Sequence, residues 1–123
     1  MTRVLVATAS VHTTAAACDY LVGRLGAEDE VIVLTVTGPD LATRDAGDAA
    51  NVARTRLLEP TIEAVTREGK PADVIREIAT ERAVDEIVIG LHGGDPERAG
   101  EPPGSTVLAL LDSADRPVVV VPV

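Results

Sequence analysis

The sequence predicts an α/β fold with a doubly wound, open, parallel five-stranded sheet and helices on both faces. Two observations predict it: five short β-rich runs alternate strictly with segments of helical periodicity, and most of the runs are continuously apolar. Continuous apolar runs are typical of strands buried on both faces, and strict alternation with helices is typical of a parallel sheet. A length of 123 residues suits one domain, so we expect residues 1–123 to form a single domain.

The expected strands are short and mostly free of charge. They comprise residues 4–7, 31–36, 61–65, 86–89 and 117–121. The third run differs from the others because Glu63 makes it alternate between polar and apolar residues. Alternation indicates a strand with one exposed face, so we expect residues 61–65 at an edge of the sheet.

Four apolar stripes with spacings of three and four residues indicate the helices between these strands. The stripes are Cys18-Leu21-Val22-Leu25, Ala49-Val52-Ala53-Leu57, Ile75-Ile78-Ala79 and Val107-Leu108-Leu111. We expect Gly26 and Pro60 to end the first two helices. Pro71 suits the first turn of the third helix, and either Ser105 or Thr106 is the expected N-cap of the fourth.

The composition excludes several classes of partner. Eleven basic and 20 acidic residues give a net charge of −9, which repels nucleic acid because such binding requires basic side chains at the phosphates. Tyr20 is the one aromatic residue, which argues against flavin, haem and single-stranded nucleic-acid sites. Lys70 is the one lysine, and an acidic, lysine-poor composition is typical of halophilic proteins.

The sequence also argues against a membrane or exported protein. No apolar run approaches the roughly 18–20 residues that span a bilayer. The apolar run near the amino terminus stops at Thr8, which is too short for a signal peptide. We therefore expect a cytoplasmic protein without a membrane partner.

Few side chains are candidates for catalysis or metal binding. Cys18 lies on the first apolar stripe, which favours a buried packing role over a reactive thiol. Ser10 and His12 have no third residue to orient them, and two histidines give no convincing metal site. The end of the first strand lacks the acidic cluster of a phosphoryl-accepting receiver and the glycine-rich loop of an adenylate-forming ligase. We expect no catalytic residue, and at most slow ATP hydrolysis.

The segment that follows the fourth strand is the most informative part of the sequence. Residues 91–103 show no periodicity. Two groups of residues suited to anion binding lie at the two ends of this segment: Gly90, Gly93 and Gly94 at its start, and Gly104, Ser105 and Thr106 directly after it. Glycine turns and a helix start present amides and hydroxyl groups to phosphate, although the lysine of a Walker motif is missing. The other interpretation is that the glycines only permit turns and the hydroxyl groups only cap the helix. His92 could bond a ligand or stabilise the turn.

The whole chain resembles the universal stress protein family. Four segments carry the resemblance: residues 3–7 with the helix that contains Tyr20, residues 67–75, residues 85–93 and residues 116–122. The resemblance implies a parallel sheet of strand order 3-2-1-4-5. It also implies a homodimer formed through the fifth strands, and the valine run Val118–Val121 would leave a sticky edge if unpaired.

Many members of that family bind ATP through Gly-x-x-Gly, nine residues, and Gly-[Ser/Thr]. Here ten residues separate Gly93 from Gly104 and nine separate Gly94 from Gly104, so the loop is one residue longer. Ala9 stands where nucleotide-binding members usually have an aspartate. The resemblance implies a nucleotide site made of Ala7, Thr8, Ala9, Val36, Ile89, Gly90, His92, Gly93, Gly94, Gly104, Ser105 and Thr106.

Two functions follow from these observations. The first is a homodimeric cytoplasmic protein of stress response or signalling, which binds ATP or AMP, with Mg²⁺, or another anion, between Gly90 and Thr106. The second is a protein-interaction module on the same fold that binds no nucleotide and uses the longer loop as its contact surface. The retained glycines favour the first function. Ala9 and the acidic residues Asp95, Glu97 and Glu101 in the loop favour the second, since like charge repels phosphate.

Overall fold

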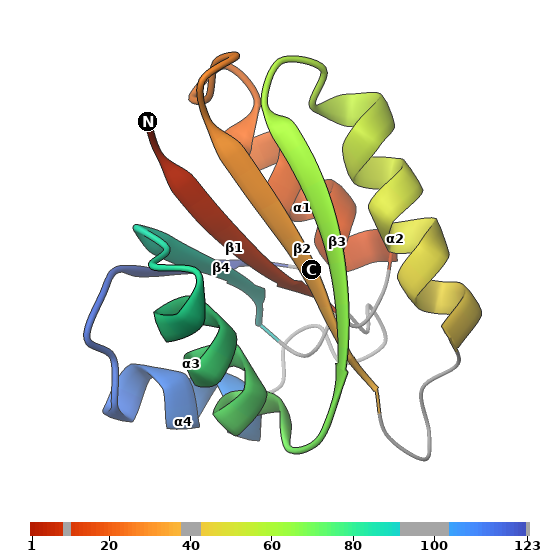
Figure 1. The fold of residues 1–123 in the computed structure, drawn as a ribbon. Helices are drawn as coiled ribbons and strands as arrows, with labels where there is room; N and C mark the ends of the chain where they lie inside the picture. The colour runs from red at the N-terminus through yellow and green to blue at the C-terminus, as the bar shows by residue number, and fades with distance from the viewer. Residues whose placement is uncertain (9–10, 38–42, 92–103, 123) are drawn as a thin grey trace.

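The computed structural model describes residues 1–8, 11–37, 43–91 and 104–122. Five strands and four helices alternate along the chain (Figure 1). They are β1 (Arg3–Thr8), α1 (Val11–Leu21), β2 (Glu30–Thr37), α2 (Thr43–Arg56), β3 (Thr61–Glu68), α3 (Pro71–Glu81), β4 (Glu86–Gly90), α4 (Ser105–Asp112) and β5 (Val118–Val121). All neighbouring strands pair in parallel in the order β3-β2-β1-β4-β5, which confirms the predicted fold class and strand order.

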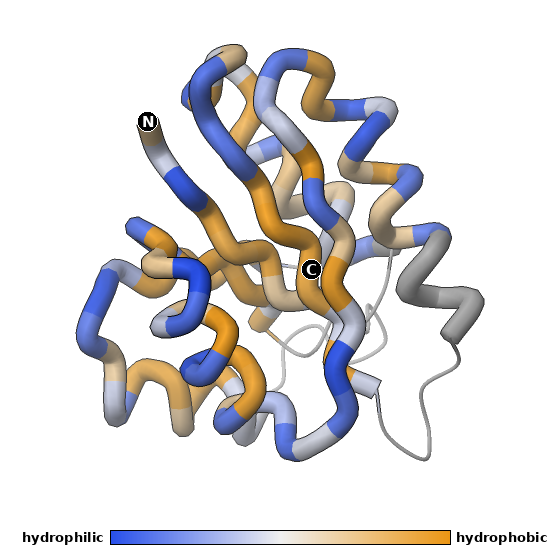
Figure 2. The backbone as a smooth tube through the Cα atoms, in the orientation of Figure 1, coloured by the Kyte–Doolittle hydropathy of each residue, from blue (hydrophilic) through white to orange (hydrophobic). Residues whose placement is uncertain are grey.

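The sheet is covered on both faces, so the core has two halves. On one face α3 and α4 pack against residues such as Leu5, Ile32 and Ile87. On the other, α1 and α2 pack against Val4, Val33 and Val88. Alternating residues of each strand enter alternate halves, and the apolar centre is visible along the strands in Figure 2. The predicted two-sided burial of the central strands is confirmed.

The predicted edge position of β3 is confirmed, and the strand is longer than expected. Only Val65 of this strand is buried and most of its other positions are exposed, and Glu63 pairs with Arg82 at 2.6 Å. At the opposite edge, β5 consists of four valines, of which three are half-buried and Val121 is buried. The two open edges of the sheet therefore differ in charge.

Two expected helix ends are wrong. α1 ends at Leu21 and not at Gly26, because the chain turns at Gly23, whose φ of +80° suits glycine. Val22, placed on the apolar stripe by its spacing, is consequently 60% exposed. α2 ends at Arg56, before Pro60, although Leu57 stays in the core. α1 and α2 approach closely because Ala17, Ala49 and Ala53 are small and buried between them and the sheet.

α4 differs from its predicted packing. Val107 and Leu110 are buried, whereas Leu108 and Leu111 are 54% and 49% exposed. The predicted stripe therefore included Leu108 and Leu111 from the outer face, because this helix is apolar on two sides. The N-cap is Gly104, with an extended backbone, so the expectation that Ser105 or Thr106 caps the helix is also wrong.

Side chains fix the turns at the amino ends of the strands. The Asp29 carboxylate accepts bonds from the amides of Thr2 and Gly26, each at 2.7 Å, and the Asp85 carboxylate accepts one from the Arg3 amide at 2.8 Å.

The described residues contain no helix long and apolar enough to cross a membrane.

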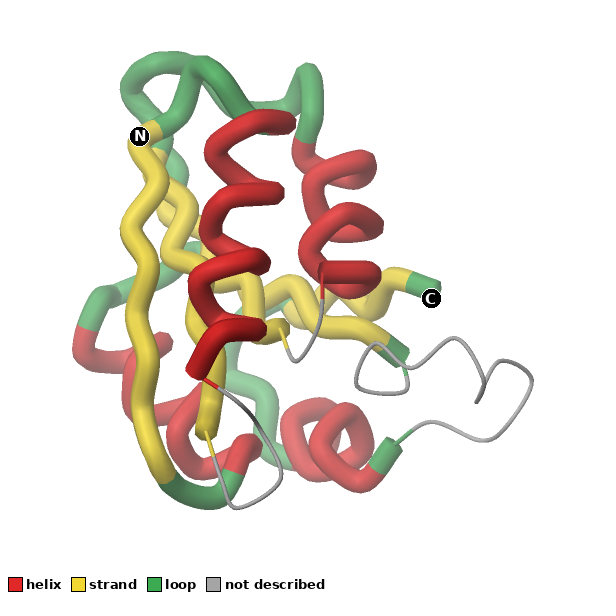
Figure 3. Tube along the Cα trace, turned by 90° about the vertical axis from the view of Figure 1, so that its right-hand side faces the viewer, coloured by secondary structure: helices red, strands yellow, loops and turns green. Residues whose placement is uncertain are grey.

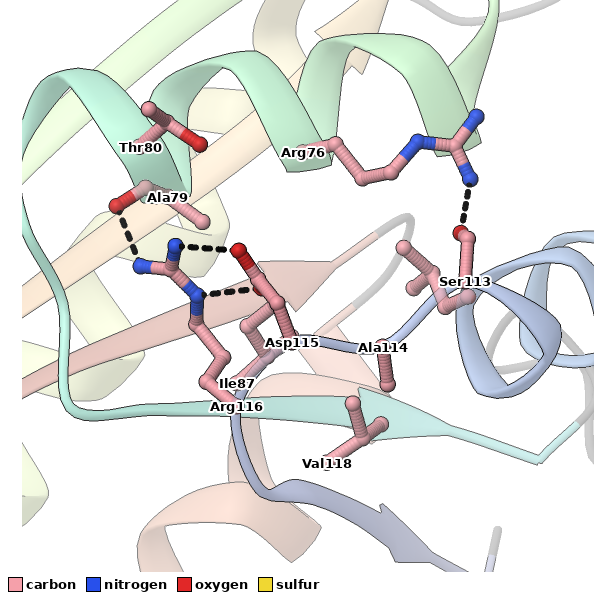
Figure 4. Close-up of a pocket in the computed structure, with 10 residues that line it drawn as sticks. Arg76, Ala79, Thr80, Ile87, Ser113, Ala114, Asp115, Arg116 and Val118 are labelled. Carbon is pink, nitrogen blue, oxygen red and sulfur yellow. Dashed lines mark hydrogen bonds and ion pairs between the residues drawn. The ribbon is translucent and has the colours of Figure 1, made fainter.

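Arg116 connects three elements at the same end of the sheet. Its guanidinium donates to the carbonyl oxygens of Ala79 and Val84 at 2.7 and 3.0 Å and forms a two-bond pair with Asp115. These bonds tie the chain before β5 to the end of α3 and to the start of β4. They line one side of a cavity of about 120 Å³, whose far side carries Arg76 and Ser113 (Figure 4).

Candidate functional site

The candidate site lies at the carboxyl ends of β1 and β4. These strands are neighbours, yet α1 follows β1 onto one face of the sheet and α4 lies on the other face. The connections therefore diverge at this point. At such a point an open α/β fold is expected to have a crevice outside the strand ends, and we call this region of the protein the crevice. This is the switch point of the fold, where open α/β sheets bind ligands.

One wall of the crevice is formed where β4 meets the start of α4. The Leu91 amide donates to the Val121 carbonyl oxygen at 3.0 Å, which extends the β4–β5 pairing past the end of β4. The Leu91 carbonyl oxygen then accepts the Gly104 amide at 3.0 Å. This bond brings the amino end of α4 directly to the end of β4, although 12 residues separate Leu91 from Gly104 in the sequence. Sequence reasoning missed Leu91, because its role depends on this closure.

The amino end of α4 carries no side chain at its N-cap position. The first amides of a helix have no carbonyl partner within the helix, and a side chain at the N-cap usually satisfies one of them. Gly104 has no side chain, and no side-chain cap bond is found here among the described residues. Ser105 is exposed and Thr106 half-buried at this helix start. Amides and hydroxyl groups are thus presented together, with the positive end of the helix dipole.

The floor of the crevice is small and mostly apolar. Ala7 is buried in register with Ile89 of β4 and with Leu34 of β2. Val36 is partly buried and packs on the same half of the core. The Thr8 hydroxyl lies 2.9 Å from that of Thr14 at the beginning of α1, so it holds α1 against β1. A flat, uncharged group fits such a floor better than an anion does.

The structure brings together eight of the predicted site residues at one edge of the sheet. They are Ala7, Thr8, Val36, Ile89, Gly90, Gly104, Ser105 and Thr106. The other four, Ala9, His92, Gly93 and Gly94, lie outside the described residues. The acidic loop residues Asp95, Glu97 and Glu101 lie outside them too.

Other candidate residues lie away from this edge or are unsuited to chemistry. Cys18 is buried as expected, and burial raises the pKa of its thiol to about 11, so it is protonated and unreactive near neutral pH. His12 is exposed and lies within α1. In the part of the chain that is described, no three His, Cys, Asp or Glu side chains gather to hold a metal ion.

Comparisons with known proteins agree with this architecture. A comparison with curated protein sequences gives no match. Solved structures do match: UspA from Lactobacillus plantarum has 21% identity and a TM-score of 0.73, with 98% of this chain and 97% of that chain covered. An Arabidopsis thaliana universal stress family protein with AMP bound has 16% identity and a TM-score of 0.71, covering 99% and 92%. A universal stress protein in complex with cAMP has 22% identity and a TM-score of 0.72, covering 98% and 95%.

These structural likenesses establish the fold. The family assignment comes from the sequence itself, since the model of the universal stress protein family matches residues 1–122. The match spans every element of the sheet, including the strand ends and the helix start that form the crevice. The chain belongs to the universal stress protein family.

Proposed function

We propose that this protein binds an adenine nucleotide such as AMP or ATP at the carboxyl edge of its sheet, as a cytoplasmic stress-response or signalling protein. The observation that carries the proposal is the uncapped amino end of α4, held against the end of β4 by the bond from Gly104 to Leu91. We place the phosphates at this helix start, where amides and the hydroxyl groups of Ser105 and Thr106 converge.

The order of the strands indicates the direction in which a nucleotide would lie. From α4 and β4, the strand ends of β1 and β2 follow in order, each about 4.8 Å further along the sheet. A nucleotide with its phosphates at Ser105 would extend its base across Ala7 toward Val36, over the apolar floor. Adenine is flat and uncharged, which matches that floor. Solved relatives that carry AMP or cAMP add support for this class of ligand.

Calorimetry with AMP and with Mg²⁺-ATP, at low and at molar salt, tests the proposal. Ser105→Asp places a carboxylate beside the phosphates, while a negative charge in the first turn leaves the helix at least as stable. We expect this variant to weaken binding by at least about tenfold, which is about 1.4 kcal/mol. Ala27→Asp adds the same charge in an exposed turn at the amino ends of the strands, away from the candidate site, and should bind like wild type.

Two results would contradict the nucleotide proposal. The first is an absence of binding heat for the folded wild-type protein at both salt concentrations. The second is equal affinity in the Ser105→Asp and Ala27→Asp variants. The first result would favour the other function considered above, a protein-interaction module that binds no nucleotide.

We propose in addition that residues 1–123 form one domain that pairs as a homodimer through β5. An unpaired strand edge invites another strand unless charge, proline or a bulge protects it. β3 carries Glu63, Arg67 and Glu68, whereas β5 is Val118–Val121. The exposed Leu108 and Leu111 add apolar surface on α4, which packs against β5.

The removal of a single backbone amide donor can test this dimer. The carbonyl oxygens of Pro117 and Val121 face β4, so by alternation the main chain of Val118 and Val120 faces the open edge. Val120→Pro removes the backbone N–H donor of residue 120 that faces outward. Val120→Ala removes side-chain volume and keeps this donor. Sedimentation should show a dimer for wild type and Val120→Ala and a folded monomer for Val120→Pro. A wild-type protein that is monomeric at high concentration would refute the dimer.

A further inference from the structure

The strand β5, which leads to the C label in Figure 3, is held along one edge only. It consists of four residues, Val118–Val121, and β4 is its one neighbour among the described strands. Bonds from the Ile87 amide to the Pro117 carbonyl oxygen, at 2.9 Å, and from the Leu91 amide to the Val121 carbonyl oxygen, at 3.0 Å, lie at its two ends. A short strand at a solvent-exposed edge opens more easily than the core does, so its ends need further support.

Side-chain packing supplies only part of this support at the start of β5. The first residue of the strand, Val118, is half-buried and lines the cavity of about 120 Å³ together with Ile87 and Leu110 (Figure 4). A cavity leaves the side chains around it without contacts on one side, which removes part of the stabilisation that packing gives. Val121 at the other end of the strand is buried. The less firmly packed end of β5 is therefore its start.

Arg116 supplies polar bonds at this end. It lies two residues before Val118, and its guanidinium group donates to the carbonyl oxygens of Ala79, at 2.7 Å, and Val84, at 3.0 Å. The same group donates to both oxygens of the Asp115 carboxylate, at 2.9 and 3.1 Å. The Arg116 side chain is mostly buried, so the loss of these bonds would leave acceptors unpaired in a site with little access to water. The chain before β5 is thus fixed to the end of α3 and to the approach to β4.

The position of this start matters at the open edge of β5. The main chain of Val118 and Val120 faces that edge, so each residue offers one amide donor and one carbonyl acceptor to the outside. Two donors and two acceptors in alternation form an edge that is complementary to an antiparallel copy of itself, as a twofold interface requires. The partner that fits this edge is a second copy of the chain, with both residues in register.

We infer that Arg116 is a positioning residue of the homodimer, which holds the start of β5 in the geometry that pairs with a second copy. The inference rests on the proposed dimer and does not involve the nucleotide site. Without the Arg116 side chain, the residues before β5 are released, and the edge has to be ordered when the two copies associate. Ordering the backbone of one residue during association weakens the association about tenfold.

Sedimentation equilibrium of wild type, Arg116→Ala and Asp29→Asn tests the inference. Asp29→Asn is the matched control, because it also removes charge-assisted bonds at the amino ends of the strands, but in the turn before β2, with β1 and β4 between that turn and β5. We expect the Kd of the dimer to rise about tenfold or more in Arg116→Ala and less than about twofold in Asp29→Asn. A role in stability alone would lower the thermal stability of both variants and leave both dimer affinities unchanged.

Arg116→Lys provides a second variant in case Arg116→Ala does not fold. It keeps the charge and loses the planar fork, so its dimer Kd should lie between those of wild type and Arg116→Ala. Equal Kd values for the folded Arg116 variants and for Asp29→Asn would overturn the inference and leave the dimer in place. A monomeric wild-type protein would overturn the proposed dimer and this inference with it.

Discussion

The two ends of the parallel sheet are built differently. At the amino ends of the strands, side chains close the turns: Asp29 bonds two amides, Asp85 bonds one, and Arg116 bonds two carbonyl oxygens. At the carboxyl ends of β1 and β4, the main chain closes the structure through Leu91 and Gly104, and the start of α4 has no side-chain cap within the described residues.

Because of this difference, we expect stability to depend on the amino edge of the sheet and ligand binding to depend on the carboxyl edge. Polar groups that bond within the fold hold the amino edge together, whereas at the carboxyl edge the described residues provide no side-chain cap for the first amides of α4. Substitutions at the amino edge should therefore change the free energy of unfolding with little effect on ligand affinity. Substitutions such as Ser105→Asp should do the reverse.

The largest expected effect is that of Arg116→Ala at the amino edge. Its side chain is only 16% exposed, and its removal leaves the carbonyl oxygens of Ala79 and Val84 without their donor. We expect a loss of about 2–3 kcal/mol in unfolding free energy, measured by urea denaturation. AMP affinity of the folded variant should be unchanged, and a large affinity loss would show that the two edges are coupled.

Gly69→Ala should show that the carboxyl edge also has a position critical for stability. The φ of +143° at Gly69 is essentially restricted to glycine, and an added Cβ would lie 2.9 Å from Cγ2 of Val74. We expect a loss of about 2 kcal/mol by denaturation. Gly23→Ala is the matched control, since Gly23 has a φ of +80° and no atom within 4 Å of the added Cβ. It should cost about 1 kcal/mol, and equal losses would rule out the contact with Val74 as a cause.

Asp29→Asn should change how the stability of the protein depends on pH, because Asp29 closes a turn at the amino edge. The amides of Gly26 and Thr2 lower the pKa of the Asp29 carboxyl in the folded protein. The charged form therefore stabilises the fold above the unfolded pKa of about 3.9, and this contribution is lost as the pH falls through the lower folded pKa. Urea unfolding should show Asp29→Asn less stable than wild type at pH 7, with the gap closing below pH ~4. A gap that stays constant with pH would contradict the role of the charge.

The smallest expected effect is a gain, from Ala83→Gly at the turn between α3 and β4. Ala83 has a φ of +50°, in the left-handed region that favours glycine, at the amino edge. Relief of this conformation is worth about 1–2 kcal/mol, and the greater freedom of glycine when unfolded offsets part of it. We expect a net stabilisation of about 0.5 kcal/mol by denaturation. A loss of stability would show that the Ala83 methyl group contributes packing.

Much of the fold could be predicted because it depends on local patterns. Apolar runs located all five strands, Glu63 indicated the edge strand, and Pro71 marked the start of α3. Periodicity could not decide which side of α4 is buried, because Val107, Leu108, Leu110 and Leu111 are all apolar. It also could not place the end of α1, where Gly23 provides the turn before Gly26 is reached.

The candidate site was only partly predictable for a physical reason. The resemblance indicated Gly90, Gly104 and Ser105, which follow one another across a single connection. The bond between Leu91 and Gly104 depends on the packing of separate elements.

An NMR titration of ¹⁵N-labelled wild-type protein with AMP can show which edge of the sheet binds the ligand, because it reports both edges at once. We expect amide shift changes at the carboxyl edge, at Thr8, Val36, Gly90, Leu91, Ser105 and Thr106. The amides of Gly26, Asp29 and Asp85 at the amino edge should stay unchanged. Changes that concentrate at the amino edge, or a spectrum unaffected by saturating AMP, would contradict this expectation.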